Sequence, residues 1–420
     1  MPKVSKVKAY QILDCRADPT VKVQIVLDNG ISAVASVPSG KSKGKYEALE
    51  LRDKNKHFCG RGVQKACQNI EEIIQKAIKG FEIAEQKKLD NFLIELDGTP
   101  NKSKLGANAI LAVSLAYARV SAKALGLPLF KYIQIAAEQI GLKSEEKFPY
   151  PMLNILNGGV HASNNVDIQE FIVIPQFETF SKNIESGCRI YKALEEILKS
   201  LKMPTLVGDE GGFAPNLSSH TEGLELLKQA VEQVKLKLGK DVFLGIDVAS
   251  SQLYKAEEKF YYFNLEKVAL SYKQLTALYK EWQKKFHLLT VEDGLAEEDY
   301  EGWSYLTNQL KDKLILVGDD LFVTNPKRLE MGIEKGMANA VLVKVNQIGT
   351  LTESLQVCKL ARQANYKIVI SHRSGETTDD FIADLAYGIG ADFIKAGAPA
   401  RGERVAKYNK LLEIEFSLNK

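Results

Sequence analysis

The stretch Leu288-Leu289-Thr290-Val291-Glu292 decides the fold, because it is an apolar run that ends in a side chain able to do chemistry. The pattern recurs along the second part of the chain, with a helix-like stretch before each new run. The other runs are residues 242–246 before Asp247, 314–318 before Asp319, 340–343 before Lys344, 367–371 before His372-Arg373-Ser374, and 392–394 before Lys395. Continuous Val, Ile and Leu runs are typical of strands buried on both faces. Their spacing fits one strand plus one helix of a βαβ unit.

Two architectures produce this alternation, a closed (β/α)8 barrel and a doubly wound open sheet. Six successive runs end in charged or hydrogen-bonding residues. Only a closed barrel brings every strand end to one site. We therefore predict an α/β fold in which the second part of the chain is a (β/α)8 TIM barrel.

The first part of the chain has a different pattern. Residues 4–37 alternate apolar and polar side chains, with Asp28-Asn29-Gly30 as a hairpin turn. From about residue 63 to 138 the apolar period becomes helical. A short polar segment, residues 139–147, then precedes two prolines. We predict a smaller N-terminal α+β domain over residues 1–138 and a catalytic barrel domain over residues 139–420.

Composition excludes several classes of function. The 56 basic and 53 acidic side chains of the 420 residues leave a net charge of +3, without a long run of either sign, so nucleic acid is not an expected partner. The five cysteines are scattered, which fits a reducing compartment rather than a disulfide scaffold. No segment resembles a signal peptide or reaches the ~20 apolar residues of a membrane span. We expect a cytoplasmic protein.

Three strand ends supply the carboxylates Asp247, Glu292 and Asp319 and no histidine or thiolate. A single acid is more often a helix cap or a salt-bridge partner. Three negative charges gathered in a partly buried cleft would repel one another without a cation. Oxygen ligands favour Mg²⁺, so the sequence predicts a magnesium site.

Three cations, Lys344, Arg373 and Lys395, follow other strands of the same series. A guanidinium next to the Ser374 hydroxyl suits a phosphate, so we expect a substrate with more than one acidic group. Positive charge around a buried lysine favours loss of its proton, which would let Lys344 act as a base. Lys344 could equally be a simple anion clamp.

Two glycine-rich segments add acidic groups. Residues 157–161 lead to Gln169 and Glu170, and residues 208–212 contain Glu210. Glycine lets the backbone approach a ligand closely, although most Gly-Gly pairs are turns. Two glutamates in one cleft raise the pKa of one another, so one of the pair can stay protonated and act as a general acid.

Six blocks of sequence resemble the enolase family, in order and over essentially the whole chain. The blocks are residues 96–99, 208–216, 317–321, 344–354, 371–377 and 397–401. The resemblance implies reversible dehydration of 2-phosphoglycerate to phosphoenolpyruvate. It also implies an irregular barrel whose opening strands are not all parallel, and a homodimer that can assemble further.

The resemblance also assigns roles to residues. Lys344 would remove the C2 proton, and Glu210, assisted by Glu170, would protonate the leaving C3 hydroxyl. Two Mg²⁺ ions would stabilise the enediolate; a lysine base with magnesium is already known for enolase-type sites. Asp247, Glu292 and Asp319 would bind the first Mg²⁺, and Ser42 would bind a second Mg²⁺ that arrives with the substrate. Arg373 and Ser374 would contact the phosphate, and Lys395 and Gln169 the carboxylate and hydroxyl end. His161 would lie in the closed pocket.

The chain departs from the family pattern at three places. Residues 14–20 contain Cys15 and Ala17 where serine and glycine are usual, and the loop from 39 to 44 carries Lys41 and Lys43. Lysines on a loop that closes over a phosphate can change both KM and kcat. Position 22 is usually acidic and position 413 basic where they meet across the dimer, but here they are Lys22 and Glu413.

Two other functions compete with this interpretation. A related barrel dehydratase or racemase would act on an unphosphorylated acid, which Arg373-Ser374 and the Ser42 loop disfavour. A surface role, in which exposed lysines such as Lys420 bind another protein, could coexist with catalysis and would require a fraction at the cell surface or outside the cell.

Overall fold

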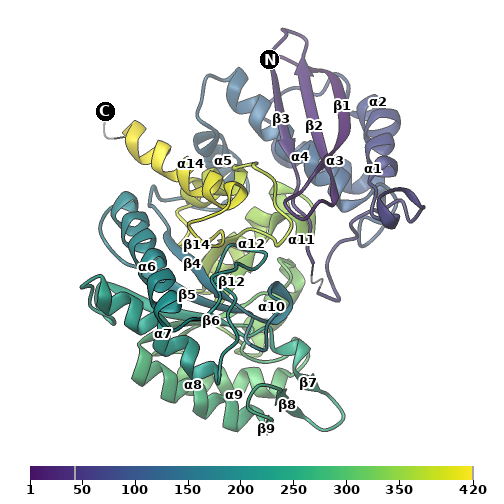
Figure 1. Ribbon diagram of the computed structural model, residues 1–420. Helices are drawn as coiled ribbons and strands as arrows, with labels where there is room; N and C mark the ends of the chain where they lie inside the picture. Colours follow the sequence, from purple (N-terminus) through teal and green to yellow (C-terminus); the bar gives the residue numbers. More distant parts are fainter. Residues whose placement is uncertain (42–43, 419–420) are drawn as a thin grey trace.

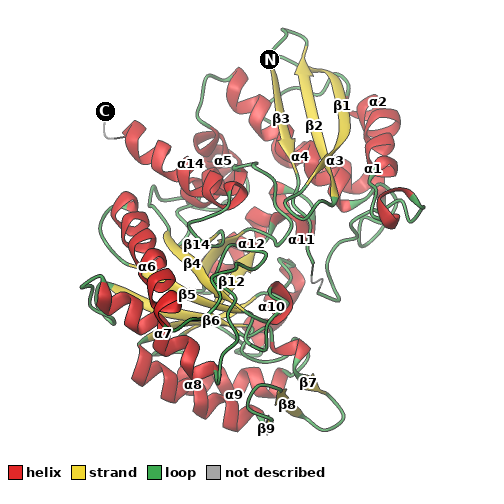
Figure 2. Ribbon diagram, viewed as in Figure 1, coloured by secondary structure: helices red, strands yellow, loops and turns green. Residues whose placement is uncertain are grey.

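The computed structural model of the protein describes residues 1–41 and 44–418. A smaller α+β region precedes a barrel, and the N-terminal sheet stands to one side of the barrel in Figure 1. Helices surround the barrel strands, as the colouring of Figure 2 shows. The predicted fold class is confirmed.

The N-terminal sheet is antiparallel, in the order β1 (Val4–Leu13), β2 (Pro19–Leu27) and β3 (Ser32–Ser36). Every second residue of β2, including Val21, Val23 and Ile25, is fully buried, as the alternation predicts. The predicted turn at Asp28–Gly30 lies between β2 and β3. One face of the sheet is thus covered by the helices that follow.

The helical segments of this region end before residue 140. They are the 3-10 turn η1 (His57–Gly60), α1 (Gln64–Asn69), the π-helical segment η2 (Ile70–Ile74), α2 (Gln75–Ile78), α3 (Gln86–Asp97), α4 (Ala107–Ala124) and α5 (Leu129–Glu138). Helix α4 packs on β2 and β3 and is apolar on almost all sides, so nearly all of it is buried. No single helix of the described residues is long and apolar enough to cross a membrane; α4 and α5 pass that test only together, and they meet at 109°.

Eight strands close the barrel in the order β10-β11-β12-β13-β14-β4-β5-β6. They are β4 (Tyr150–Asn157), β5 (Glu170–Pro175), β6 (Val242–Asp247), β10 (Leu288–Glu292), β11 (Ile315–Gly318), β12 (Ala340–Val343), β13 (Lys367–Ser371) and β14 (Phe393–Lys395). The six predicted strands are all present, to within one residue at their ends. Strand β5 runs antiparallel to both neighbours and the other pairs are parallel, so the expected irregular opening is confirmed.

Helices form the outer layer of the barrel. They are α6 (Phe180–Ser200), α7 (His220–Gln233), α8 (Tyr272–Phe286), α9 (Tyr300–Leu310), α10 (Pro326–Glu334), α11 (Val345–Ile348), α12 (Leu351–Gln363), α13 (Phe381–Gly388) and α14 (Gly402–Leu418). Side chains cap six of them, satisfying free backbone N–H groups: Thr179, Ser219, Ser271, Asp299, Asn325 and Thr350. A small antiparallel sheet, β7 (Tyr254–Lys255), β8 (Phe260–Phe263) and β9 (Val268–Leu270), and the short turns η3 (Gly159–His161) and η4 (Ser250–Gln252) complete the fold.

Buried hydrogen bonds hold the two regions together. Asp90 of α3 accepts hydrogen bonds from the backbone N–H and the hydroxyl of Thr352 on α12, at 2.9 and 2.6 Å. Lys102 pairs with Glu353 at 2.9 Å. The loop after β3 then crosses the barrel mouth, where Ser39 and Gly375 exchange backbone hydrogen bonds. The N-terminal region therefore contributes residues to the end of the barrel that carries the predicted site.

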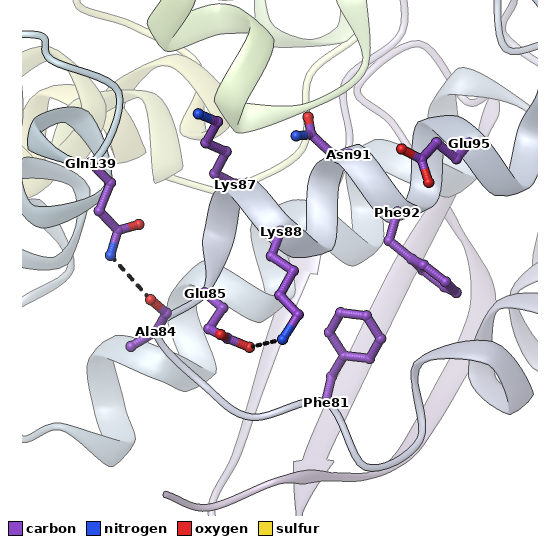
Figure 3. Close-up of a pocket in the computed structure, with 9 residues that line it drawn as sticks. All are labelled: Phe81, Ala84, Glu85, Lys87, Lys88, Asn91, Phe92, Glu95 and Gln139. Atoms are coloured by element: carbon purple, nitrogen blue, oxygen red, sulfur yellow. Dashed lines mark hydrogen bonds and ion pairs between the residues drawn. The ribbon is translucent and has the colours of Figure 1, made fainter.

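A surface groove of about 580 Å³ lies in the N-terminal region beside α3 (Figure 3). The Phe81 and Phe92 rings form one wall, and Lys88 pairs with Glu85 at 2.8 Å. None of the predicted site residues lines this groove, so it has no part in the chemistry below.

Candidate active site

The inward face of the barrel strands leads directly to the predicted site residues. Ala340 and Leu342 of β12 fill the barrel interior, and Lys344 is the next residue on that face. On β5, Ile172 lies inside the barrel and Glu170 is the next inward position. The alternation of each strand therefore aims these charged groups at the mouth.

The reversal of β5 brings Glu170 to the same end of the barrel as the carboxyl ends of the other strands. Glu170 is the first residue of β5, and the register pairs it with Asp247, the last residue of β6. Strands β5 and β12 are four places apart in either direction around the ring. Glu170 and Lys344 thus occupy opposite sides of the mouth.

Lys395 is the centre of a buried ionic cluster. Its ammonium lies 2.9 Å from Glu170, 3.0 Å from Asp247 and 2.8 Å from Glu292. Burial disfavours the ammonium, but the three carboxylates outweigh burial and hold the pKa of Lys395 well above its ordinary value. Gln169 also donates to Asp247, at 3.2 Å. Five residues predicted to contact metal, contact substrate or transfer a proton are therefore adjacent in space.

Lys344 contacts the carboxylate of Asp319, which also accepts a hydrogen bond from Gln347 at 3.0 Å. Burial disfavours the ammonium of Lys344, but the Asp319 carboxylate favours it, and the pKa of Lys344 lies above its ordinary value. The sequence reasoning expected a lowered pKa, and in this structure the direction is the opposite. The cause is the direct contact with Asp319, a carboxylate for which a metal ion would compete.

The donor set of Asp247, Glu292 and Asp319 fits a hard divalent cation. Burial, and then the Asp247 charge, raise the pKa of Glu292 to about 8, so a negative charge at Glu292 is disfavoured despite the neighbouring lysines. Glu292 Oε1 is buried and has no hydrogen-bond donor within the described part of the chain. Lysine ammonium groups supply the positive charge here.

Three other groups of described residues offer ligand atoms within 4.8 Å of one another, and the predicted triad is not among them. Those groups are His161, Glu170 and Glu210; Asp167, His220 and Glu266; and Asp293, Asp319 and Asp320. In the last group, Asp293 accepts hydrogen bonds from the backbone of Asp319 and Asp320, which gives it a structural role.

Glu170 and Glu210 flank His161. The Nδ1 atom of His161 lies 3.5 Å from Glu170 and 3.7 Å from Glu210. Burial and the charge of Glu210 raise the pKa of Glu170 well above its ordinary value. The pKa of Glu210 is lowered despite burial, because His372 and His161 favour its charged form. The expected rise in pKa is therefore found for Glu170, whereas Glu210, the residue to which the resemblance gives the role of acid, is shifted in the opposite direction by the neighbouring histidines.

Two neighbours of Glu210 were not among the predicted site residues. His372 Nε2 lies 3.3 Å from Glu210 Oε2, and Asn154 donates to the same oxygen at 3.0 Å. His372 follows β13 immediately, so the strand-end rule could have selected it. Asn154 lies inside β4, where sequence offers no comparable signal.

Arg373 presents a two-pronged anion site. Its guanidinium holds the Glu47 carboxylate through two contacts of 3.1 Å and donates to Asn346 at 2.9 Å. Ser374 Oγ accepts hydrogen bonds from Arg16 and from the backbone of Lys41, at 3.0 and 2.9 Å. The Glu47 carboxylate thus occupies the two-pronged guanidinium of Arg373, a group whose geometry also suits a phosphate.

Lys41, in the loop after β3, contacts the two glycine-rich segments at the barrel mouth. Its ammonium donates to Val160 O at 2.7 Å and pairs with Asp209 at 2.9 Å. Further along, Lys45 and Tyr46 both contact Glu298. Ser42 and Lys43, between these anchors, lie outside the described residues, as does Lys420.

Lys41→Ala is expected to raise KM by no more than about fivefold, because an exposed ion pair contributes about 0.2–1 kcal/mol. Steady-state kinetics of the proposed reaction at low and high salt would measure the effect. Asp209→Asn, which removes the other half of the pair, should match Lys41→Ala. Equal KM in all three proteins at low salt would show that this pair does not hold the loop.

The candidate site is a narrow space of about 20 Å³ enclosed by converging side chains. Its lining residues are His161, Gln169, Glu170, Glu210, Asp247, Lys344, Ser371, His372, Arg373, Ser374 and Lys395. Glu292 and Asp319 join it through the two lysines. All the predicted site residues except Ser42 are thus brought together.

Two family models match the chain. The enolase N-terminal domain matches residues 4–133, and the enolase C-terminal TIM barrel domain matches residues 145–420. The matched regions correspond to the α+β region and the barrel described above. The chain belongs to the enolase superfamily, whose proteins bind a divalent metal, and its two domains indicate a lyase or dehydratase.

Proposed function

We propose that the protein is an enolase that dehydrates 2-phosphoglycerate to phosphoenolpyruvate. The observation that carries this proposal is the position of Lys344 and Glu170 on opposite sides of the barrel mouth, with Glu210 on the other side of His161 from Glu170. A substrate held between them meets a base on one face and acids on the other. This is the arrangement that removal of a proton and a hydroxyl from adjacent carbons requires.

Each residue then has one task. Lys344 takes the C2 proton, and the C2–H electron pair becomes the C2–C3 double bond when the C3–O bond breaks. Glu210, assisted by Glu170, gives a proton to the departing hydroxyl, which leaves as water. Arg373 and Ser374 bind the phosphate, while Lys395 and Gln169 contact the carboxylate and hydroxyl end and His161 closes the pocket.

Asp247, Glu292 and Asp319 would hold one Mg²⁺, and Ser42 would contribute to a second that arrives with substrate. Positive charge at this position stabilises the negative charge that builds up on the substrate carboxylate as the C2 proton leaves. In the structure, Lys395 pairs with Asp247 and Glu292, and Lys344 pairs with Asp319, so lysines neutralise the same three carboxylates.

The direct test is phosphoenolpyruvate formation, followed by absorbance, with Mg²⁺ and after treatment with a chelator. Turnover of 2-phosphoglycerate should require Mg²⁺ and return when it is added back. The unphosphorylated analogue glycerate should not be dehydrated, because it leaves the Arg373 and Ser374 contacts unmade. Turnover of glycerate at a similar rate would instead favour a dehydratase of unphosphorylated acids.

We also propose a homodimer in which Lys22 of one copy pairs with Glu413 of the other. Lys22 lies on β2, and the Glu413 side chain on α14 is 71% exposed. Lys22→Glu should weaken the dimer, and adding Glu413→Arg should restore it, because the pair is then rebuilt with reversed charges. Sedimentation measures all three proteins, and equal dimer strength in each would contradict the proposed contact.

A further inference from the structure

Arg404 is a fully buried arginine on α14 whose guanidinium reaches the back of the candidate site. One nitrogen, Nη1, lies 2.7 Å from His372 Nδ1 and donates to Arg373 O at 2.6 Å. The other, Nη2, donates to Ser374 O at 2.7 Å and to Asp209 O at 3.2 Å. One side chain therefore binds both segments that carry Glu210 and the anion site.

The contact with His372 determines which ring nitrogen carries the proton. A guanidinium has only hydrogen-bond donors, so His372 Nδ1 must accept. The proton of the neutral ring is then on Nε2, which lies 3.3 Å from Glu210 Oε2. A proton on Nδ1 would be directed at the N–H of Arg404. This geometry excludes the other neutral tautomer and disfavours the doubly protonated ring.

We propose that Arg404 is a positioning residue that fixes His372 as the Nε2–H tautomer, so that the ring donates a hydrogen bond to Glu210. The charged groups around His372 are Glu210 on one side and Arg404 and Lys395 on the other. Burial and these two cations hold the pKa of His372 at about 3, despite the opposing effect of Glu210. The ring therefore stays neutral at physiological pH. The catalytic consequence rests on the proposed role of Glu210; the tautomer itself does not.

Lys407 provides a matched control on the same helix. It is as buried as Arg404, and its ammonium contacts Glu376 at 2.8 Å and Thr377 O at 2.6 Å. Lys407→Met thus removes a buried cation of α14 that contacts the loop after β13, without removing a contact of His372. A general loss of packing would affect both variants, whereas loss of the tautomer would affect only Arg404→Met.

Two-bond ¹H–¹⁵N spectra of protein with ¹⁵N-labelled histidine report the tautomer of each ring without turnover. The His372 signals are assigned by their loss in His372→Gln. The wild type should show neutral His372 protonated at Nε2 from pH 5 to 8, and Lys407→Met should show the same. In Arg404→Met, nothing confines the proton to Nε2, so the His372 nitrogen signals should shift toward a mixture of the two neutral tautomers, and the pKa of His372 should rise above its wild-type value because one of the two nearby cations is gone.

The same variants separate positioning from folding in kinetics. Arg404→Met should lower kcat about 10- to 100-fold, because the His372 ring would no longer hold Glu210 Oε2 in place and the proposed acid would lose its orientation. The acid side of its kcat/KM profile should move to higher pH, whereas the Lys407→Met profile should match that of the wild type. A wild-type His372 that is protonated at Nδ1, or a His372 spectrum that Arg404→Met leaves unchanged, would overturn the proposal. An inactive wild type with the expected spectrum would contradict the proposed reaction and not the positioning role.

Discussion

Lys344→Ala is expected to lower kcat for phosphoenolpyruvate formation by at least about 10²- to 10⁴-fold, the usual contribution of a general base. The variant should also fail to exchange the C2 proton of 2-phosphoglycerate with deuterium from solvent. The reason is geometric: Lys344 is the inward residue after β12 and lies across the mouth from Glu170. Absorbance measures the first effect and NMR of the substrate measures the second.

Lys344→Arg separates a base from an anion clamp, the two roles that the residue type leaves open. Arginine keeps the positive charge next to Asp319 and can bind an anion, but it does not lose its proton in proteins. A base predicts that Lys344→Arg is as inactive as Lys344→Ala. An arginine variant that retains most of the wild-type exchange rate would make Lys344 a clamp and leave the reaction without its proposed base.

The strand-end pattern predicted most of the site because a parallel barrel turns sequence order into spatial proximity. Asp247, Glu292 and Lys395 are far apart in the chain, yet each ends a strand, and the Lys395 ammonium lies within 3.0 Å of both carboxylates. Glu170 obeys the rule in reverse, since it begins a strand that runs the other way. It was selected by the glycine-rich segment that precedes it and not by the spacing of the runs.

Contacts made across domains or from remote helices were not predictable from local sequence. Glu47 contacts the Arg373 guanidinium from a loop of the N-terminal region. Arg404 contacts the backbone of Arg373 from α14. In sequence, Arg404 is one of several charged residues on an amphipathic helix. The raised pKa of Lys344 has the same origin, because it depends on which carboxylate the folded chain places against it.

Glu210→Gln is expected to separate the two halves of the proposed reaction. Glutamine keeps the size of the side chain near His372 and Asn154 but has no acidic proton to give. Loss of the leaving hydroxyl should slow about 10²- to 10⁴-fold. Removal of the C2 proton belongs to Lys344, so solvent exchange at C2 should continue.

Glu170→Gln and Glu266→Gln complete this comparison. Glu170 also contacts Lys395, which is assigned to the substrate carboxylate, so its variant should raise KM as well as slow dehydration. Glu266 lies 2.6 Å from His220 in a comparable glutamate–histidine contact outside the site, and its variant should leave both rates unchanged.

If Glu210→Gln stops C2 exchange as completely as Lys344→Ala does, Glu210 takes part before the hydroxyl leaves. If the Glu210→Gln variant dehydrates the substrate at the wild-type rate, another group delivers the proton. Glu170, which has a raised pKa, is then the nearest candidate.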